Sequence, residues 1–268
     1  MRSLFGDDLR SKLVDSSFFD LLQERRPDLL PRMGLSALEE KKGMEVPRGT
    51  TILAFRYQGG VVIAGDRQAT EGFQVASRTI EKVYKADEHS AVAIAGVAGP
   101  AVELAKLFQT ELAHYEKLEG VQLSMEGKAN KLAQMVKANL PAAMQGLIVI
   151  PIFVGYDLRK DEGKIYKYDL TGGRYEEAEY YATGSGGMHA RATMKKLYRA
   201  AMDEEEALRV AMEALYDAAE EDLGTAGPDF VRGIFPTVKV VTKEGIRDVE
   251  EERVRGIYEA ILEKRRRG

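Results

Sequence analysis

Arg48-Gly49-Thr50-Thr51-Ile52-Leu53-Ala54-Phe55 marks a change of character along this chain. It puts a threonine directly after a glycine, at the start of an apolar run that is typical of a buried strand. Cleavage of the Gly49–Thr50 bond would give Thr50 a free α-amine beside its side-chain hydroxyl. A hydroxyl nucleophile paired with an amine base can hydrolyse an amide bond without histidine or cysteine. The junction is also compatible with an ordinary strand that starts after a turn residue.

The composition is that of a globular protein with a sizeable core. The chain has 268 residues, of which 44% are hydrophobic and 31% are charged. This supports one domain of about 200–250 residues with an extra segment. The formal net charge of −4 does not indicate nucleic acid as a partner. Cysteine is absent, which excludes thiol catalysis, disulfides and cysteine-ligated metal.

Metal and membrane sites are not expected from the sequence. None of the three histidines has the spacing of a metal-binding pair, so we expect no metal and no cofactor. Charged residues interrupt positions 1–30, so they contain no apolar core of a signal peptide. No run approaches the roughly 18–20 apolar residues that span a bilayer. We therefore expect no membrane association and a cytoplasmic location.

Residues 1–49 differ from the rest of the chain. Short amphipathic segments there are interrupted by Pro27, Pro31, Gly34, Gly43 and Pro47, which prevents long helices or strands. We interpret residues 1–49 as an appendage without its own core. It is either a flexible tail or a propeptide that is removed on maturation. Residues 50–268 form the globular domain.

The pattern after Thr50 alternates blocks of strands with pairs of helices. Strands are predicted over 51–57, 61–66, 82–85, 90–96, 147–155, 164–169, 175–183 and 237–242. Helices are predicted from Pro100, over 124–140, 187–201 and 203–222, and from about 249. Hairpins dominate, so the sheets should be mostly antiparallel. The order predicts an α+β fold, a four-layer αββα sandwich.

Several short motifs follow Thr50 in a fixed order. They are Ala64-Gly65-Asp66-Arg67, Thr79-Ile80-Glu81-Lys82-Val83-Tyr84, Ile94-Ala95-Gly96-Val97-Ala98-Gly99, Gly184-Ser185-Gly186 and Asp222-Leu223-Gly224-Thr225-Ala226-Gly227. Together they resemble the β subunit of the 20S proteasome, an N-terminal nucleophile hydrolase. The resemblance extends from Thr50 to about Pro236. Residues 142–146 and 227–233 look like the bacterial, actinobacterial branch of this family.

The resemblance implies a catalytic role for each matching residue. Thr50 would be the nucleophile, with its α-amine as base after cleavage at Gly49–Thr50. Lys82 would be a cation beside Thr50 that favours loss of the hydroxyl proton, and Asp66 would orient it. Gly96 would donate its backbone N–H to the oxyanion. The supporting residues would be Ser185, Asp222 and Thr225, where the family usually has serine at position 225. Without the resemblance, Asp66 and Lys82 would be a structural ion pair and Gly96 a tight turn.

The resemblance also implies a substrate pocket. Six apolar or aromatic residues would line it, which suggests a chymotrypsin-like preference: Ala69, Ile80, Tyr84, Ile94, Ala98 and Val102. Thr70, Gly96 and Ala98 would bind the peptide backbone as an added strand. Gln68 departs from the arginine that is common at its position. This exchange would alter hydrogen bonds near Lys82 without removing a catalytic atom.

The family assembles into stacked heptameric rings of fourteen α and fourteen β subunits. The resemblance therefore implies other β subunits, α subunits, a ring-shaped ATPase regulator bound through the α rings, and protein or peptide substrates. Two alternatives stay open. One is the related two-ring bacterial threonine peptidase, which shares the Gly-Asp-x-Gln-Ala-Thr pattern at 65–70 but is shorter and lacks a long leader. The other is a non-catalytic ring subunit, which would lack the Gly-Thr junction.

Overall fold

The computed structural model describes residues 49–71 and 74–267. The predicted propeptide, residues 1–49, lies outside the described residues except for Gly49. Among the described residues, no helix is both long enough and apolar enough to cross a membrane.

The first sheet contains the strand that follows Thr50. Its strands lie in the order β10-β1-β2-β11-β12, and all neighbours pair antiparallel. They span Tyr180–Gly184 (β10), Thr51–Tyr57 (β1), Gly60–Gly65 (β2), Thr237–Thr242 (β11) and Gly245–Asp248 (β12). Strands β1 and β2 are buried almost throughout. Both faces of this sheet are covered, which explains why these two strands are continuous apolar runs.

The second sheet packs against the first and is also antiparallel. Its strands lie in the order β5-β6-β7-β8-β9. They span Val83–Asp87 (β5), Ser90–Gly96 (β6), Val149–Asp157 (β7), Glu162–Tyr168 (β8) and Arg174–Glu177 (β9). A separate two-stranded ribbon follows β2 and consists of β3 (Ala69–Glu71) and β4 (Gln74–Ser77).

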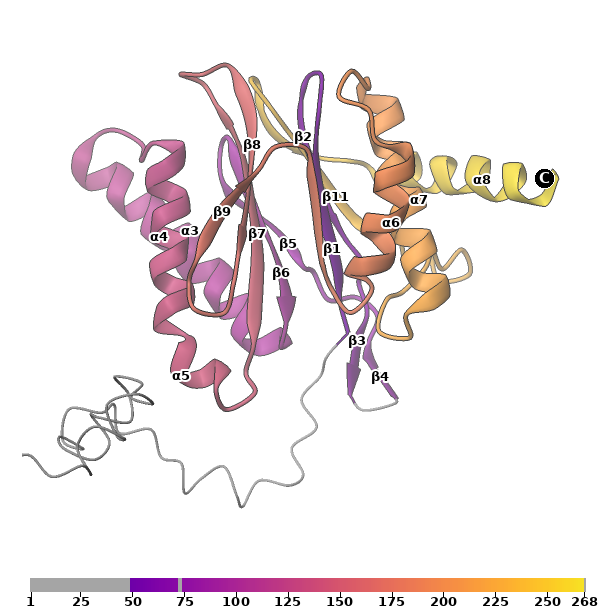
Figure 1. Ribbon diagram of the computed structural model, residues 1–268, viewed down its shortest axis with the longest axis horizontal. Coiled ribbons are helices and arrows are strands. Elements are labelled where there is room, and N and C mark those ends of the chain that lie inside the picture. The colour runs from indigo at the N-terminus through magenta and orange to yellow at the C-terminus, as the bar shows by residue number, and fades with distance from the viewer. Residues whose placement is uncertain (1–48, 72–73, 268) are drawn as a thin grey trace, which may run out of the picture. The chain divides into compact units, whose positions relative to one another are not determined.

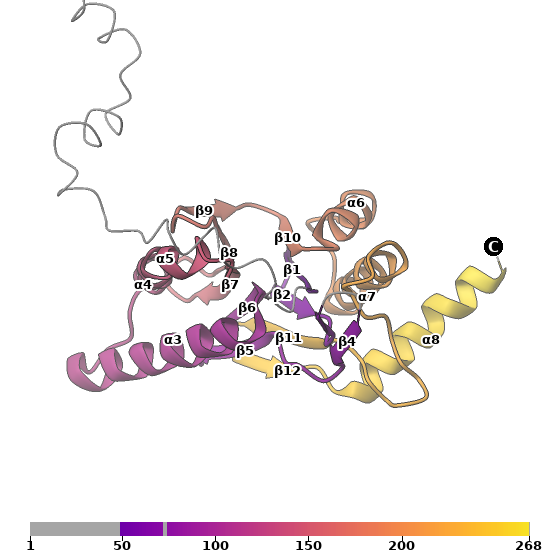
Figure 2. The ribbon, with the colours of Figure 1, turned by 90° about the horizontal axis from the view of Figure 1, so that it is seen from below.

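Helices cover the outer face of each sheet (Figures 1 and 2). Helices α3 (Ala98–Glu119) and α4 (Met125–Ala138), with the short α5 (Leu140–Ala143), lie on the side of the second sheet. Helices α6 (Gly187–Leu197), α7 (Glu204–Glu221) and α8 (Glu251–Arg267) lie on the side of the first sheet. The order across the domain is therefore helices, sheet, sheet, helices.

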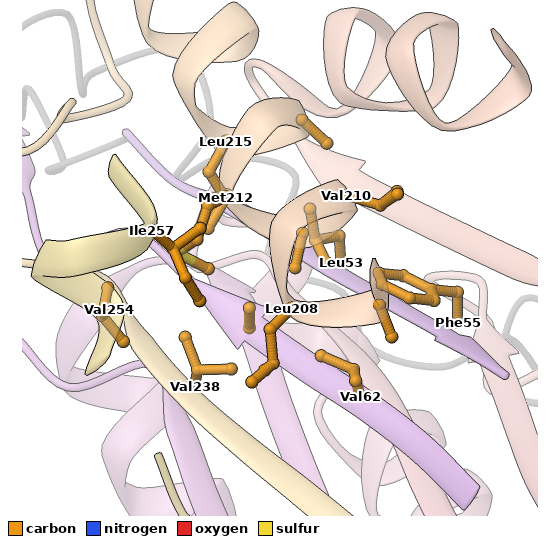
Figure 3. Packing of buried hydrophobic residues seen from close by; sticks show 14 of the residues in the cluster. Leu53, Phe55, Val62, Leu208, Val210, Met212, Leu215, Val238, Val254 and Ile257 are labelled. Carbon is orange, nitrogen blue, oxygen red and sulfur yellow. The ribbon is translucent and has the colours of Figure 1, made fainter. Parts of the chain in front are cut away.

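Three clusters of buried apolar side chains fill the spaces between these layers. Strand β1 shows how they are built, because successive side chains of a strand point to opposite faces. Ile52 and Ala54 belong to the cluster between the sheets. Leu53 and Phe55 belong to the cluster under α6, α7 and α8, part of which is drawn in Figure 3. The third cluster joins α3 and α4 to the second sheet. Three apolar interfaces separate four layers, so the predicted αββα sandwich is confirmed.

Some element predictions were wrong in detail. The single strand predicted over 175–183 is two strands, because β9 ends at Glu177 in the second sheet and β10 begins at Tyr180 in the first. The residues between them contain no glycine or proline, and a period of two does not reveal which sheet a strand joins. The helix predicted over 187–201 ends at Leu197. Neither β3, β4 nor β12 was predicted.

Candidate active site

Thr50 lies directly before β1, the strand that pairs with β10 and β2. Its side chain is buried, with 5% of the residue exposed. Its carbonyl oxygen accepts a hydrogen bond from the Ser185 backbone N–H at 2.8 Å. Gly184 makes this close approach possible: it has φ +97°, and a Cβ there would lie 2.0 Å from the Thr50 carbonyl oxygen. The end of β10 therefore fixes the backbone of Thr50.

Neighbouring atoms also approach Gly49, the residue before Thr50, too closely for a side chain. A Cβ at Gly49 would lie 2.5 Å from Thr70 Oγ1 and 2.7 Å from the Gly224 carbonyl oxygen. Glycine is therefore the residue that fits between the start of β3 and the loop after α7. The Thr50 hydroxyl donates to the Gly49 carbonyl oxygen at 2.5 Å. The Gly-Thr junction is thus enclosed by protein on several sides.

Asp66 follows β2 and anchors four donors with its two carboxylate oxygens. Oδ1 accepts from the Thr51 backbone N–H at 2.8 Å and from Lys82 Nζ at 2.7 Å. Oδ2 accepts from the backbone N–H groups of Gln68 at 2.9 Å and Ala226 at 3.1 Å. Asp66 is fully buried, so these bonds compensate for its desolvation. One carboxylate therefore connects four separate parts of the chain.

Lys82 precedes β5 and is 4% exposed. Its ammonium donates to Asp66, to the Gln68 carbonyl oxygen at 2.6 Å and to the Gly49 carbonyl oxygen at 3.0 Å. Burial lowers the pKa of Lys82 from its ordinary value, and the neighbouring Asp66 carboxylate opposes this shift. All three N–H donors of the ammonium have an acceptor. The lysine therefore presents a positive charge to the carbonyl of the Gly49–Thr50 bond.

A chain of hydrogen bonds lies on the other side of Thr50. The Thr50 N–H donates to Ser185 Oγ at 3.3 Å, and Ser185 Oγ donates to Asp222 Oδ2 at 2.5 Å. Thr225 Oγ1 also donates to Asp222 Oδ2, at 2.5 Å, and lies 2.6 Å from Thr51 Oγ1. Of the predicted residues, Ser185 contacts the Thr50 nitrogen, Asp222 contacts Ser185, and Thr225 contacts Asp222. The part played by Thr51 was not predicted.

A small pocket opens beside Thr50. Five of the six predicted lining residues border it: Ala69, Ile80, Tyr84, Ile94 and Ala98. Gly96 also lines it and has φ +125°, a conformation in which a side chain would be strained. Val102 is not among the lining residues, and Ala101, one position earlier on α3, takes its place. Helical rotation separates neighbouring residues by about 100°, so a shift of one position changes the face.

The charge of the pocket differs from the prediction in one respect. Glu81 borders the pocket together with the apolar residues. Its Oε1 lies 3.8 Å from Lys239 Nζ, and its side chain is half exposed. The Tyr84 hydroxyl donates to the Glu81 carbonyl oxygen. Burial, and then the Glu81 charge, raises the pKa of Tyr84 to about 12. The tyrosine is therefore a neutral wall of the pocket at neutral pH.

Gln68 and Thr70 flank this site on the segment after β2. The Gln68 side-chain amide donates to the Leu223 carbonyl oxygen at 2.9 Å, a contact that the sequence did not predict. Thr70 is buried, and its hydroxyl is the atom that a side chain at Gly49 would meet first. Within 49–71 and 74–267, no group of three or more His, Cys, Asp or Glu side chains could hold a metal ion.

The architecture and the threonine-centred site are those of the N-terminal nucleophile hydrolases. Comparison with known families narrows this class, because the proteasome subunit family model matches residues 46–230. The chain belongs to the proteasome subunit family.

Similar proteins named proteasome subunit beta occur in actinobacteria. The protein of Streptomyces griseus is 54% identical over 251 residues, which cover 93% of this chain and 89% of that protein. The protein of Acidimicrobium ferrooxidans is 58% identical over 215 residues, with 80% and 79% covered. The protein of Rhodococcus jostii is 50% identical over 277 residues, with 98% and 92% covered. The predicted resemblance to the actinobacterial branch is therefore confirmed.

Proposed function

We propose that this chain is a threonine endopeptidase, the catalytic β subunit of a 20S proteasome core that degrades unfolded or tagged proteins. One observation carries the proposal: the Lys82 ammonium contacts both the buried Asp66 carboxylate and the carbonyl oxygen of the Gly49–Thr50 bond. An ion pair that served stability alone would not need to reach that carbonyl. The proposal also draws on the Gly-Thr junction itself and on the β-subunit relatives.

The first reaction is self-cleavage at Gly49–Thr50. The Thr50 hydroxyl oxygen bonds to the Gly49 carbonyl carbon, and the Lys82 ammonium stabilises the charge that develops on the Gly49 oxygen. The carbon–nitrogen bond then breaks, the hydroxyl proton ends on the Thr50 nitrogen, and an ester remains on the Thr50 oxygen. Water hydrolyses the ester. The products are a propeptide ending in a Gly49 carboxylate and a Thr50 with a free hydroxyl and a free α-amine.

The second reaction is peptide hydrolysis by the mature residue. The new α-amine has a pKa of about 7.7–8.0 in model compounds, so it can accept the hydroxyl proton near neutral pH. Ser185 contacts this nitrogen and is itself held by Asp222, and Lys82 favours the deprotonated hydroxyl. The Gly96 backbone N–H stabilises the oxyanion of the substrate. While the propeptide is attached, the Thr50 nitrogen is an amide and cannot act as a base.

Peptide turnover tests the proposed activity. We expect purified, assembled wild-type protein to cleave fluorogenic peptides, Thr50→Ala to be inactive, and Thr50→Ser to retain part of the activity because it keeps a hydroxyl. Turnover by Thr50→Ala equal to that of the wild type would disprove the assigned nucleophile.

The pocket supports a preference for large apolar or aromatic residues before the scissile bond. Burying a leucine or phenylalanine side chain there gains about 1.5–3 kcal/mol, whereas an unpaired charge would cost several kcal/mol. The Glu81 carboxylate faces Lys239 and does not alter this expectation. Peptides ending in tyrosine, leucine, arginine and glutamate measure the preference. Ala98→Glu should move it toward arginine, and faster wild-type cleavage after arginine would refute an apolar pocket.

The relatives' names support assembly with other proteasome subunits. We infer stacked heptameric rings with fourteen α and fourteen β subunits in the cytoplasm. A ring-shaped ATPase would deliver protein substrates through the α rings. Native mass spectrometry of the chain expressed with its α subunit measures this stoichiometry.

A further inference from the structure

Gln68 contacts both sides of the site with three different atoms. Its backbone N–H donates to Asp66 Oδ2 at 2.9 Å, and its carbonyl oxygen accepts from Lys82 Nζ at 2.6 Å. Its side-chain Nε2 donates to the Leu223 carbonyl oxygen at 2.9 Å. The residue is buried, with 6% exposed. Any residue except proline could make both backbone contacts. The contact with Leu223 depends on the glutamine side chain.

The loop after α7 is held at its far end, where the Ala226 N–H donates to Asp66 Oδ2 and Thr225 Oγ1 lies 2.6 Å from Thr51 Oγ1. It carries Asp222, which accepts from both Ser185 and Thr225, but Leu223 next to Asp222 is 92% exposed. Apolar burial therefore does not fix this position. Two of the loop's hydrogen bonds are internal, from the N–H groups of Gly224 and Thr225 back to Asp222. The Gln68 amide adds a bond at Leu223, beside Asp222, to the Ala226–Asp66 bond at the other end of the loop.

The position of this loop also sets the space around the scissile bond. A Cβ at Gly224 would lie 2.9 Å from the Gly49 Cα and 2.8 Å from Ser185 Oγ. Movement of the Leu223 backbone would therefore move Gly224 relative to both the Gly49 carbonyl and the Thr50 nitrogen. A displacement of about 1 Å in a reacting geometry can cost about 100-fold in rate.

We propose that Gln68 is a positioning residue that joins the two halves of the site through its side-chain amide. This inference rests on the proposed threonine peptidase function and deepens it. The amide holds the Asp222–Thr225 loop against the Gly49–Thr50 junction before cleavage and against the Thr50 amine afterwards. Being neutral, it makes this connection without adding a charge beside the Asp66–Lys82 pair.

The test compares Gln68→Met, which keeps the length of the side chain and removes the donor, with a matched control. Gln109→Met removes the same kind of bond elsewhere, since the Gln109 amide donates to the Lys85 carbonyl oxygen at 2.9 Å on the surface of α3. Each variant is assembled with its partner subunits. The measurements are kcat and KM per processed chain, the processing rate by intact mass, and Tm.

We expect Gln68→Met to lower kcat about 10-fold or more with little change in KM, because the pocket residues do not belong to the loop. Processing should slow in parallel, and Gln109→Met should match the wild type. An assembled Gln68→Met that is not processed but keeps the wild-type Tm also supports the proposal. Unchanged kcat and processing, or an equal fall in Gln109→Met, overturn it.

Gln68→Asn serves where Gln68→Met does not assemble, since it keeps an amide that is too short to reach Leu223. If Gln68→Asn assembles, it should show the same fall in kcat. If both variants fail to assemble, Gln68 supports the fold and the positioning role is wrong. A wild-type protein that is neither processed nor active refutes the proposed function itself, separately from any comparison between variants.

Discussion

At the scale of single residues, the buried pair of Asp66 and Lys82 dominates the site. A second buried lysine, Lys128, pairs with the partly buried Asp87 at 2.6 Å. The two pairs have similar exposure and distance. Of these two lysines, only Lys82 also contacts the Gly49 carbonyl oxygen. Substituting each lysine in turn therefore distinguishes the loss of an ion pair from the loss of the proposed catalytic contact.

Lys82→Met should therefore abolish most turnover while the subunit still folds. Loss of an activating proton-transfer partner typically costs about 10²–10⁴-fold in rate. Lys128→Met should lower Tm through its unpaired Asp87 and leave turnover per processed chain unchanged. Fluorogenic peptide assays and thermal melts of both variants give the comparison. Near-normal turnover in Lys82→Met would assign the Asp66–Lys82 pair to stability alone.

The pH dependence of the processed enzyme should show two limbs. Activity rises with pH as the Thr50 α-amine loses its proton, near about 7.7–8.0. Activity falls again when the Lys82 ammonium loses its proton. Burial lowers the pKa of Lys82, so this fall should begin below the ordinary lysine value of 10.5. Measurement of kcat/KM against pH checks both limbs, and a plateau that extends beyond the ordinary value would contradict the role of the buried ammonium.

The grouping of most site residues could be predicted from the resemblance, which matched them position by position. Thr50, Asp66, Lys82 and the Ser185–Asp222–Thr225 set meet as expected. Gln68 was predicted to affect hydrogen bonds near Lys82, but its bond to Leu223 and the contacts of Thr51 were missed because common side chains and backbone groups make them. Such contacts depend on which loops lie together, which the sequence pattern does not reveal. Val102 was predicted to line the pocket, whereas Ala101, one position earlier on α3, lines it.

At the scale of elements, helix α7 supports the loop that carries Asp222. It begins with a capping box, in which the Asp203 side chain accepts from the Glu206 N–H and the Glu206 side chain accepts from the Asp203 N–H. Its last residue is Glu221, directly before Asp222. The capping box therefore lies at the opposite end of α7 from Asp222.

Asp203→Ala should therefore reduce stability without reducing turnover per processed chain. Loss of an N-cap typically costs about 1 kcal/mol, which lowers Tm by roughly 2–4 °C for a domain of this size. Asp203→Ser keeps an acceptor and should melt close to the wild type. Thermal melts and kcat measurements on both variants test this. A fall in kcat with an unchanged Tm would contradict this, because it would mean that the N-terminal end of α7 affects the geometry of the site.

At the scale of the whole described domain, the layers could be predicted and the sheet membership could not. The alternation of strand blocks with pairs of helices along the chain predicted the αββα order. The crossing from β9 to β10 was missed because neither glycine nor proline marks the bend at 178–179. That crossing matters, because β10 brings Gly184 and Ser185 to Thr50.

The central claim is that Thr50 becomes the N-terminal residue by its own chemistry. Intact-mass measurement of the assembled wild type and of Thr50→Ala tests this directly, with Thr50→Ser as the variant that keeps a hydroxyl. We expect the wild type to lose residues 1–49, Thr50→Ser to lose them more slowly, and Thr50→Ala to keep them. Cleavage of Thr50→Ala at the same bond and rate, or a fully active wild type that retains residues 1–49, would contradict it.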